Sequence, residues 1–245
     1  DLSAASAASA LGTDSFTGFI NVIGSAEGDS IIGDSDNNSI SAGDGADTIT
    51  GGLGSNTIDG EAGIDVITYK SIGSAVTVNL GANSATGWGG ADSITGIENI
   101  IGPDVASNLS GDGSANSIVG GSSGDTIEGG AGSDTIDGGS GDDLVLGGSG
   151  ADSLIGGIGR NTLSYSDAST AVSINLSSGT ANGGAFGNDT FTGFINVIGS
   201  AEGDSIIGDS DNNSISAGAG ADTITGGLGS NTIDGEAGID VITYE

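Results

Sequence analysis

One aliphatic residue recurs every nine positions along the middle of the chain, with polar residues and glycine between the copies. Each copy lies in a short run that follows a glycine-rich segment, a pattern typical of short strands separated by turns. A unit of this size cannot bury its single apolar side chain alone, so the units have to stack on one another. The pattern therefore predicts an all-β stack. We expect these residues to point inward: Ile118, Ile127, Ile136, Val145, Leu154 and Leu163.

The repeated unit is close to G-G-x-G-x-D-x-(Ile/Leu/Val)-x. It is most regular at 120–164, and a sixth in-frame copy precedes it at 111–119. Two further blocks of the same unit occupy 24–68 and 199–243. A single G-x-G-x-D carries little information, whereas six consecutive copies in one frame indicate a repeat architecture.

The segments between the blocks have a different pattern, and residues 69–102 resemble residues 165–199. Both contain the apolar alternation of a half-buried strand. The residues on its apolar face are Val76, Val78 and Leu80 in the first segment and Val172, Ile174 and Leu176 in the second. We expect wider β coils that join the blocks within one solenoid, and a separate small β domain is the alternative.

The predicted organisation has six parts. They are the end of a preceding wider coil at 1–23, block 1 at 24–68, connecting coils at 69–110, block 2 at 111–164, connecting coils at 165–198, and block 3 at 199–245.

Blocks 1 and 3 are near copies of each other. Residues 14–70 and 189–245 match at an offset of 175 with three differences: Ser15/Thr190, Asp44/Ala219 and Lys70/Glu245. Both ends of the chain fall inside a repeat, so we expect a tandem segment of a longer protein.

The chain carries 33 acidic and two basic residues, a formal net charge of −31. Binding to nucleic acid needs cations, so nucleic acid is not an expected partner. So many carboxylates either stay solvated or bind metal ions, and their fixed places in a glycine frame favour metal. The sequence has no His and no Cys, so we expect no enzyme activity. It has no 18-residue apolar run, so we expect no membrane insertion.

The nonapeptide resembles the calcium-binding repeat of RTX (hemolysin-type) proteins. This resemblance implies a right-handed parallel β-roll, or β-solenoid, in which two nonapeptides form one coil and turns on the same edge recur every 18 residues. It also implies Ca²⁺ as the cofactor, with several ions bound in the turns. A further implication is a place outside the cell.

In the family, one ion lies between two turns on the same edge. The earlier turn supplies the carbonyls of positions 2 and 4 and the Asp of position 6, and the later turn supplies carbonyls 1 and 3 and its own Asp. The implied ligands in block 2 are Gly121, Ser123, Asp125, Gly138, Ser140 and Asp143 for one site, and Gly130, Gly132, Asp134, Gly147, Ser149 and Asp152 for the next. In block 1 they are Gly43, Gly45, Asp47, Gly60, Ala62 and Asp65, with Asp29 and Asp47 as a looser site. Block 3 repeats this pair with Asp204, Gly218, Gly220, Asp222, Gly235, Ala237 and Asp240.

Position 6 alternates between two residue types in block 1. In chain order it is Asp29, Asn38, Asp47, Asn56 and Asp65. With 18 residues per coil, all the Asp residues lie on one edge and both Asn residues on the other. Asn can hydrogen-bond to its own turn, so we interpret this as a calcium edge opposite an Asn ladder. Asn as a weakened calcium ligand is the alternative, because Asp34 and Asp36 lie nearby.

These features predict a structural role. We expect a calcium-dependent repeat segment of an extracellular surface-layer, filament or adhesin protein, which folds on calcium binding after secretion and associates with neighbouring copies of the same repeat. A ligand-binding adhesin module and the C-terminal secretion or folding tail of a secreted enzyme are the alternatives. Trp88 is the one aromatic residue that suggests a ligand platform, and a role in packing is the simpler interpretation.

Overall fold

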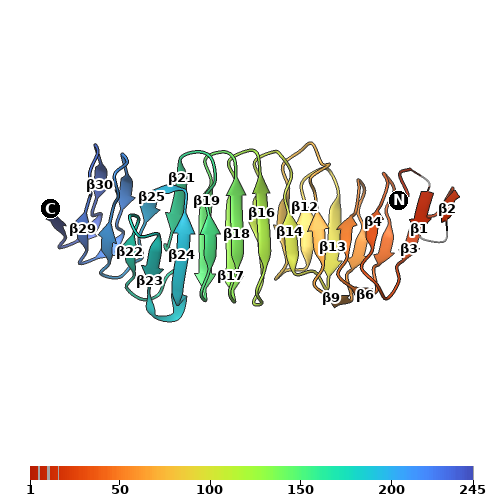
Figure 1. The fold of residues 1–245 in the computed structure, drawn as a ribbon, viewed down its shortest axis with the longest axis horizontal. Coiled ribbons are helices and arrows are strands. Elements are labelled where there is room, and N and C mark those ends of the chain that lie inside the picture. Colours follow the sequence, from red (N-terminus) through yellow and green to blue (C-terminus); the bar gives the residue numbers. More distant parts are fainter. Residues whose placement is uncertain (5, 10–11, 16, 245) are drawn as a thin grey trace.

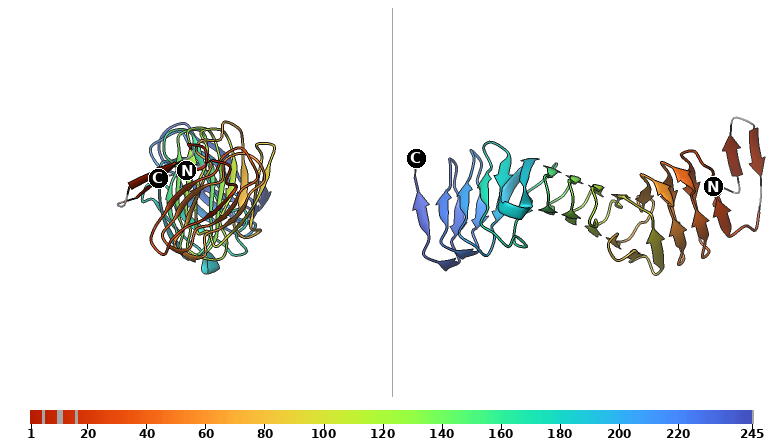
Figure 2. Two further views of the ribbon diagram at one scale, coloured as in Figure 1. Left: turned by 90° about the vertical axis from the view of Figure 1, so that its right-hand side faces the viewer. Right: turned by 90° about the horizontal axis from the view of Figure 1, so that it is seen from below.

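The structure is a computed structural model, and it describes residues 1–4, 6–9, 12–15 and 17–244. Glu245, one of the three positions that differ between blocks 1 and 3, lies outside these residues. The chain forms an elongated stack of short strands with its N-terminal end at the right of Figure 1. In Figure 2, the left view looks along the long axis, so that successive coils overlap, and the right view shows the coils side by side along that axis.

Two sheets of 13 strands run along the stack, and we call them sheet 1 and sheet 2. From the N-terminal end, sheet 1 contains β4 (Ser30–Ile32), β7 (Thr48–Thr50), β10 (Val66–Thr68), β14 (Asn99–Ile101), β16 (Ser117–Gly121), β18 (Thr135–Gly139), β20 (Ser153–Ile155), β24 (Asn188–Thr192), β23 (Thr180–Asn182), β22 (Ser173–Asn175), β26 (Ser205–Ile207), β29 (Thr223–Thr225) and β32 (Val241–Thr243). In the same direction, sheet 2 contains β3 (Asn21–Ile23), β5 (Ser39–Ser41), β8 (Thr57–Asp59), β13 (Ala91–Thr95), β12 (Ser84–Thr86), β11 (Thr77–Asn79), β15 (Asn108–Ser110), β17 (Thr126–Ala131), β19 (Leu144–Ser149), β21 (Asn161–Ser164), β25 (Phe194–Ile198), β27 (Ser214–Ser216) and β30 (Thr232–Asp234).

The remaining elements of the described chain are short. They are the antiparallel pair β1 (Ser6–Ser9) and β2 (Gly12–Ser15), the parallel pairs β6 (Asp44–Gly45) with β9 (Ala62–Gly63) and β28 (Ala219–Gly220) with β31 (Ala237–Gly238), and the 3-10 helix η1 (Gly184–Phe186).

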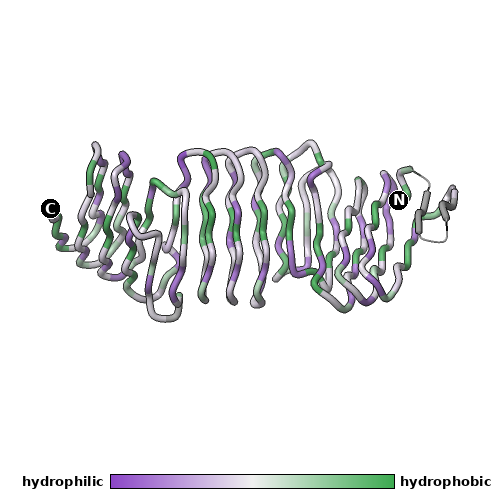
Figure 3. Tube along the Cα trace, in the orientation of Figure 1, coloured by the Kyte–Doolittle hydropathy of each residue, from purple (hydrophilic) through white to green (hydrophobic). Residues whose placement is uncertain are grey.

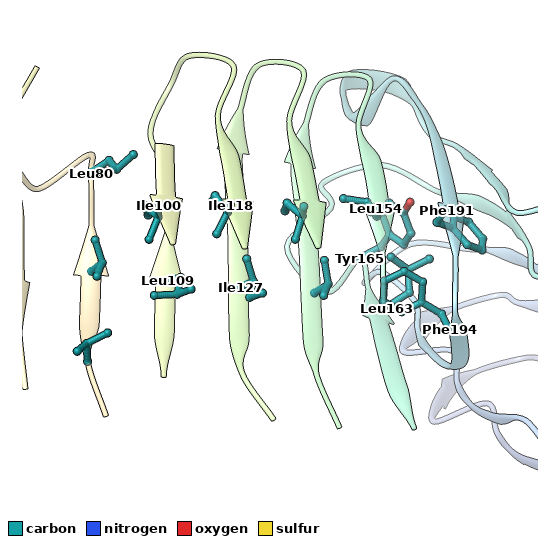
Figure 4. Packing of buried hydrophobic residues seen from close by; sticks show 14 of the residues in the cluster. Leu80, Ile100, Leu109, Ile118, Ile127, Leu154, Leu163, Tyr165, Phe191 and Phe194 are labelled. Atoms are coloured by element: carbon teal, nitrogen blue, oxygen red, sulfur yellow. The ribbon is translucent and has the colours of Figure 1, made fainter. Parts of the chain in front are cut away.

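Successive nonapeptides alternate between the two sheets, and within a block each strand pairs in parallel with the strand 18 residues later. Ile118 in β16 pairs with Ile136 in β18, and Ile127 in β17 pairs with Val145 in β19. The six side chains that the sequence predicts to point inward are all buried. Figure 4 shows two facing rows between the sheets, with Ile118 and Leu154 in one row and Ile127 and Leu163 in the other. The structure therefore confirms the predicted all-β parallel solenoid.

The core is thin, because each nonapeptide contributes one apolar side chain to it. Along the tube in Figure 3, hydrophobic positions lie within the strands and alternate with hydrophilic ones. Among the described residues, no helix has the length and apolar character that would be needed to cross a membrane.

The connecting segments continue the same sheets through two antiparallel meanders. In the first, β11, β12 and β13 lie side by side in sheet 2, with β13 next to β8 and β11 next to β15. In the second, β22, β23 and β24 occupy the corresponding place in sheet 1. Each meander adds two strands to one sheet while the opposite sheet continues with direct neighbours. The extra strands thus lengthen first sheet 2 and then sheet 1 along the stack.

Aromatic side chains gather beneath these meanders. Tyr69 and Trp88 pack with ring centroids 5.0 Å apart, and Tyr165 and Phe186 with centroids 6.4 Å apart. The Trp88 indole N–H donates to the carbonyl of Gly54 at 3.1 Å. Trp88 is therefore a packing residue that fixes the meander against block 1.

Candidate metal centres

A ladder of side chains connects the coils at the turns. We call the turns that lead into sheet 1 edge 1, and the turns that lead into sheet 2 edge 2. On edge 1, Asp134 Oδ1 accepts the backbone N–H of Asn116 at 2.8 Å, and Asp152 Oδ1 accepts that of Asp134 at 2.9 Å. On edge 2, Asp143 Oδ1 accepts the N–H of Asp125 at 2.8 Å. One oxygen of each position-6 side chain therefore binds the coil before it.

Among the described residues, the second oxygen of most Asp side chains at position 6 has no hydrogen-bond partner. It is buried and unpartnered at Asp47, Asp65, Asp125, Asp134, Asp143, Asp152 and Asp222. A buried anionic oxygen without a donor or a cation is costly, so buried charges are normally paired or bound to metal. All seven were predicted as metal ligands, and all seven belong to turns on the two edges.

The Asn turns contain no such oxygen, because the amide supplies its own donor. Asn116 Nδ2 donates to the carbonyl of Glu98 at 2.7 Å, and Asn38 Nδ2 donates to that of Ile20 at 3.3 Å. Asn56 Oδ1 continues the ladder by accepting the N–H of Asn38 at 2.9 Å. The amide group thus satisfies the turn without a cation. That ions avoid this edge of block 1 stays a prediction.

The backbone conformation at position 2 separates the turns that are closed by their own N–H from those that are not. In GSAEGD, the N–H of Ser25 donates to Asp29 Oδ2 at 2.6 Å, and in block 3 the N–H of Ser200 does the same to Asp204. At Gly130 (φ 106°) and Glu61 (φ 65°), position 2 has a positive φ and the second oxygen of the Asp in the same turn has no partner. A side chain at Gly130 would also collide with the preceding coil. Asp29 and Asp204, predicted for the looser sites, therefore already have a donor on Oδ2.

The first glycine of the turn leaves open a space that two oxygen atoms border. A Cβ atom on Gly120 would lie 2.7 Å from Asp125 Oδ2 and 2.5 Å from the Gly138 carbonyl oxygen. A Cβ atom on Gly129 would collide with Asp134 Oδ2 and with the Gly147 carbonyl oxygen. The structure therefore brings the unpartnered carboxylate oxygen next to carbonyl 1 of the following turn, as predicted for both block 2 sites.

Several other predicted carbonyl ligands also hydrogen-bond between coils. The Gly121 carbonyl accepts from Ser140 N–H at 2.9 Å, the Ser149 carbonyl from Gly132 N–H at 2.9 Å, the Gly43 carbonyl from Ala62 N–H at 3.3 Å, and the Gly218 carbonyl from Ala237 N–H at 3.1 Å. A carbonyl oxygen has two lone pairs, so one remains for an ion. Asp240, the last predicted carboxylate, has an exposed side chain in the final described coil.

The donor set fits calcium. Calcium takes six to eight hard oxygen ligands, many of them carbonyls, whereas magnesium demands a tighter octahedron. Within the described residues, no group of three or more His, Cys, Asp or Glu side chains could hold a metal alone. Paired carboxylates such as Asp134 and Asp152 would thus need backbone carbonyls to complete the shell.

A match to a protein-family model identifies these turns. The model of the RTX calcium-binding nonapeptide repeat matches residues 23–58, 32–67, 110–145, 129–163, 198–233 and 207–242, which together cover more than half of the chain. The chain belongs to the RTX nonapeptide repeat family. RTX nonapeptides are calcium-binding structural repeats of secreted proteins, so the unpartnered oxygens lie where this family uses calcium. No curated protein matches the chain.

Burial makes the RTX carboxylates hard to ionise without a cation. Loss of solvation raises the pKa of Asp125 and of Asp134 to about 6, although the backbone N–H groups of Ser107 and Asn116 act in the opposite direction. The neighbouring charges of Asp143 and Asp152 raise the two pKa values further. Burial likewise raises the pKa values of Asp65, Asp143, Asp152 and Asp222.

Protons should therefore compete with calcium for the RTX turns. A carboxyl group with a raised pKa in the folded state binds its proton more tightly there than in the unfolded chain. Without calcium, the fold should gain stability as the pH falls from about 7 towards 4. Calcium needs the ionised groups, so between pH 7 and pH 5 its affinity should fall by roughly tenfold for each of Asp125 and Asp134, whose pKa values are about 6. Calorimetric calcium titrations at the two pH values would measure this, and equal affinities would contradict it.

Sequence reasoning missed three residues that belong to the ladder. Asp92 and Asp189, in the meanders, accept the N–H groups of Asn56 at 2.8 Å and Asp152 at 2.9 Å. Their second oxygens accept the hydroxyl groups of Tyr69 at 3.0 Å and Tyr165 at 2.7 Å, respectively. In these two RTX coils a phenol donates to the oxygen that other turns leave unpartnered. The sequence feature that could have indicated Asp92 and Asp189 is the Tyr residue shared by the two connecting segments at their start.

The third missed residue is Glu98. Its Oε2 accepts the N–H of Asp65 at 2.8 Å, which extends edge 1 across a spacing of 33 residues instead of 18. Comparison of TGIENIIG at 95–102 with TGFINVIG at 192–199 would have shown the one acidic difference.

Proposed function

We propose that this chain is a calcium-dependent structural segment of an extracellular surface-layer, filament or adhesin protein, and that it folds on calcium binding after secretion. The observation that carries this proposal is the set of seven buried, unpartnered carboxylate oxygens along a continuous stack. A rod whose coils are held together by ions is a spacer or lattice element. Nothing in this role requires a catalytic group.

Coupling of folding to calcium supports a place outside the cell. Binding free energy becomes folding free energy where the site does not exist in the unfolded chain. The unfolded chain, with a net charge of −31 and 51 glycines, is solvated and repels itself. Extracellular calcium modules bind at roughly 10⁻⁴ to 10⁻³ M, so such a chain stays unfolded at cytosolic calcium and folds after export.

Association with neighbouring copies of the repeat is part of this proposal. Each coil inside the stack is covered by the next one: Ile67 in β10, for example, is fully buried where β10 pairs with β14. Neighbouring copies of the repeat would associate in the same way, with coil stacked on coil and strand paired with strand.

Calcium should therefore lengthen the particles of the 245-residue chain. We expect light scattering and electron microscopy to show rods that grow end to end when calcium is added and that disperse in chelator. A strictly monomeric particle over a wide range of protein and calcium concentrations would contradict assembly. That result would favour the alternative of an enzyme's secretion tail.

The ligand-binding adhesin module has less support. Trp88 is the aromatic residue that could stack on a sugar, and its indole is occupied by Tyr69 and by the Gly54 carbonyl.

A further inference from the structure

Block 1 meets the first meander at Asp65, where the next edge-1 turn is not a nonapeptide. The hydrogen-bond ladder of sheet 1 continues there with Asn99, whose N–H donates to the Asp65 carbonyl at 2.9 Å. Glu98 Oε2 accepts the N–H of Asp65 at 2.8 Å, in the role that Oδ1 of an Asp has elsewhere on the ladder. A short turn of the meander thus replaces a whole nonapeptide turn at this joint.

The second oxygen of Asp65 has no partner at this joint. Asp65 is fully buried, and its Oδ2 receives no hydrogen bond. A Cβ atom on Gly60 would collide with both Asp65 Oδ2 and the Gly96 carbonyl oxygen, so these oxygens border one space. The nonapeptide pairs have the same three parts: a buried unpartnered oxygen, a carbonyl of the next turn and a second carboxylate.

Internal copies of the joint show when the second carboxylate is present. The octapeptide TGIENIIG at 95–102 has two near copies, both TGFINVIG, at 17–24 and 192–199. In these copies Ile20 and Ile195 occupy the position of Glu98. Ile195 follows Asn161, whose Nδ2 donates at 2.9 Å to the carbonyl of Gly193, the counterpart of Gly96. In this copy, the preceding side chain is a neutral amide that satisfies the carbonyl, and the turn has Ile. At Asp65 it is an unpartnered carboxylate, and the turn has Glu.

We propose that Asp65, the Gly96 carbonyl and Glu98 hold a further calcium ion, which fastens the first meander to block 1. This inference rests on the proposed calcium-dependent function and adds a site outside the nonapeptide pattern. The ion would satisfy Asp65 Oδ2 as the Tyr69 hydroxyl satisfies the second oxygen of Asp92. Without the ion, the carboxylates of Asp65 and Glu98 repel each other across the joint.

The test counts calcium ions on the full chain. Wild type, Glu98→Gln and Glu98→Ile are compared by equilibrium dialysis with elemental analysis, and Glu128→Gln, which removes an exposed carboxylate from the outer face of sheet 2, is the control. Both Glu98 variants should bind one ion fewer than wild type, and the control should bind the same number. Ile occupies this position in the two other copies, so Glu98→Ile keeps a side chain that the turn tolerates.

Hydrogen exchange in saturating calcium adds a local readout. The amides of residues 93–101 should exchange at least tenfold faster in Glu98→Gln than in wild type, while block 2 is unchanged. The converse double variant, Asn161→Asp with Ile195→Glu, should gain one ion on edge 2.

Two results would overturn the inference. If wild type binds calcium and Glu98→Gln binds the same number of ions with unchanged exchange, the site does not exist, although the proposed function stands. If wild type binds no calcium at all, the proposed function and this inference both fail.

Discussion

Removing calcium with an excess of chelator should abolish the β-sheet circular dichroism of the nonapeptide blocks. Each block buries carboxylate oxygens that no hydrogen bond satisfies. An uncompensated buried charge costs about 3–5 kcal/mol, and there are seven such oxygens, whereas whole domains are stable by only about 5–15 kcal/mol. The thin core of one apolar residue per nonapeptide cannot offset that cost. The blocks therefore need either calcium or protons to fold.

Far-ultraviolet circular dichroism in calcium, in chelator and after calcium is restored would measure this loss and its reversal. Magnesium at the same concentration is the matched control, and it should restore little structure because it keeps its waters and needs a regular octahedron. A complete β spectrum in excess chelator at pH 7 would refute coupled folding.

Asp134→Ala should weaken the calcium-dependent fold strongly, whereas Asp44→Ala should have almost no effect. The Asp134 variant removes the buried oxygen that faces the Gly147 carbonyl and also leaves the N–H of Asn116 without its acceptor. The unsatisfied N–H alone costs about 1–3 kcal/mol. Asp44 lies exposed at position 3, and its counterpart in block 3 is Ala219.

Calcium titrations followed by circular dichroism would compare the two variants. We expect the midpoint for Asp134→Ala to rise at least tenfold, or about 1.4 kcal/mol, and the midpoint for Asp44→Ala to stay at the wild-type value. Equal weakening of both would show that side-chain and backbone ligands are wrongly assigned.

Asp134→Asn separates the two roles of the carboxylate. The amide oxygen can keep the hydrogen bond from Asn116 N–H, and Nδ2 can donate to a carbonyl, as Asn116 itself does to Glu98. This variant should therefore bind calcium less tightly than wild type and yet resist unfolding better in chelator. Loss of stability in both conditions would contradict the interpretation that Asn turns close without a cation.

The repeat itself could be predicted from the sequence because its signals are local. One inward aliphatic residue per nonapeptide determines strand, face and register, and an 18-residue coil then places Asp47 above Asp65 and Asn38 above Asn56. A shift of the strand pairing by one residue would move the inward aliphatic side chains to the solvent face, so the burial of these side chains fixes the register. The resemblance to RTX repeats supplied the ligand pattern on this frame.

The sequence indicated looser sites at Asp29 and Asp204, but it did not show which carboxylate oxygens lack a donor. Asp29 and Asp47 occupy the same repeat position, yet Ser25 N–H satisfies the first and no donor reaches the second oxygen of the other. The difference depends on the backbone φ at position 2, which is decided when one coil packs against the next. Only the three-dimensional structure shows it.

The chain by itself determined the nine-residue frame, the inward core and the edge on which each Asp or Asn lies. The tertiary structure decided how the non-repeating segments join it. Alternating apolar residues such as Val76 and Val78 specify a strand with one buried face, but not its neighbour or direction. Stacking decided that β11 pairs with β15 and β13 with β8, because those partners leave no sheet edge open. The same stacking brought Glu98 to Asp65 and Tyr69 to Asp92, contacts with no fixed spacing in the sequence.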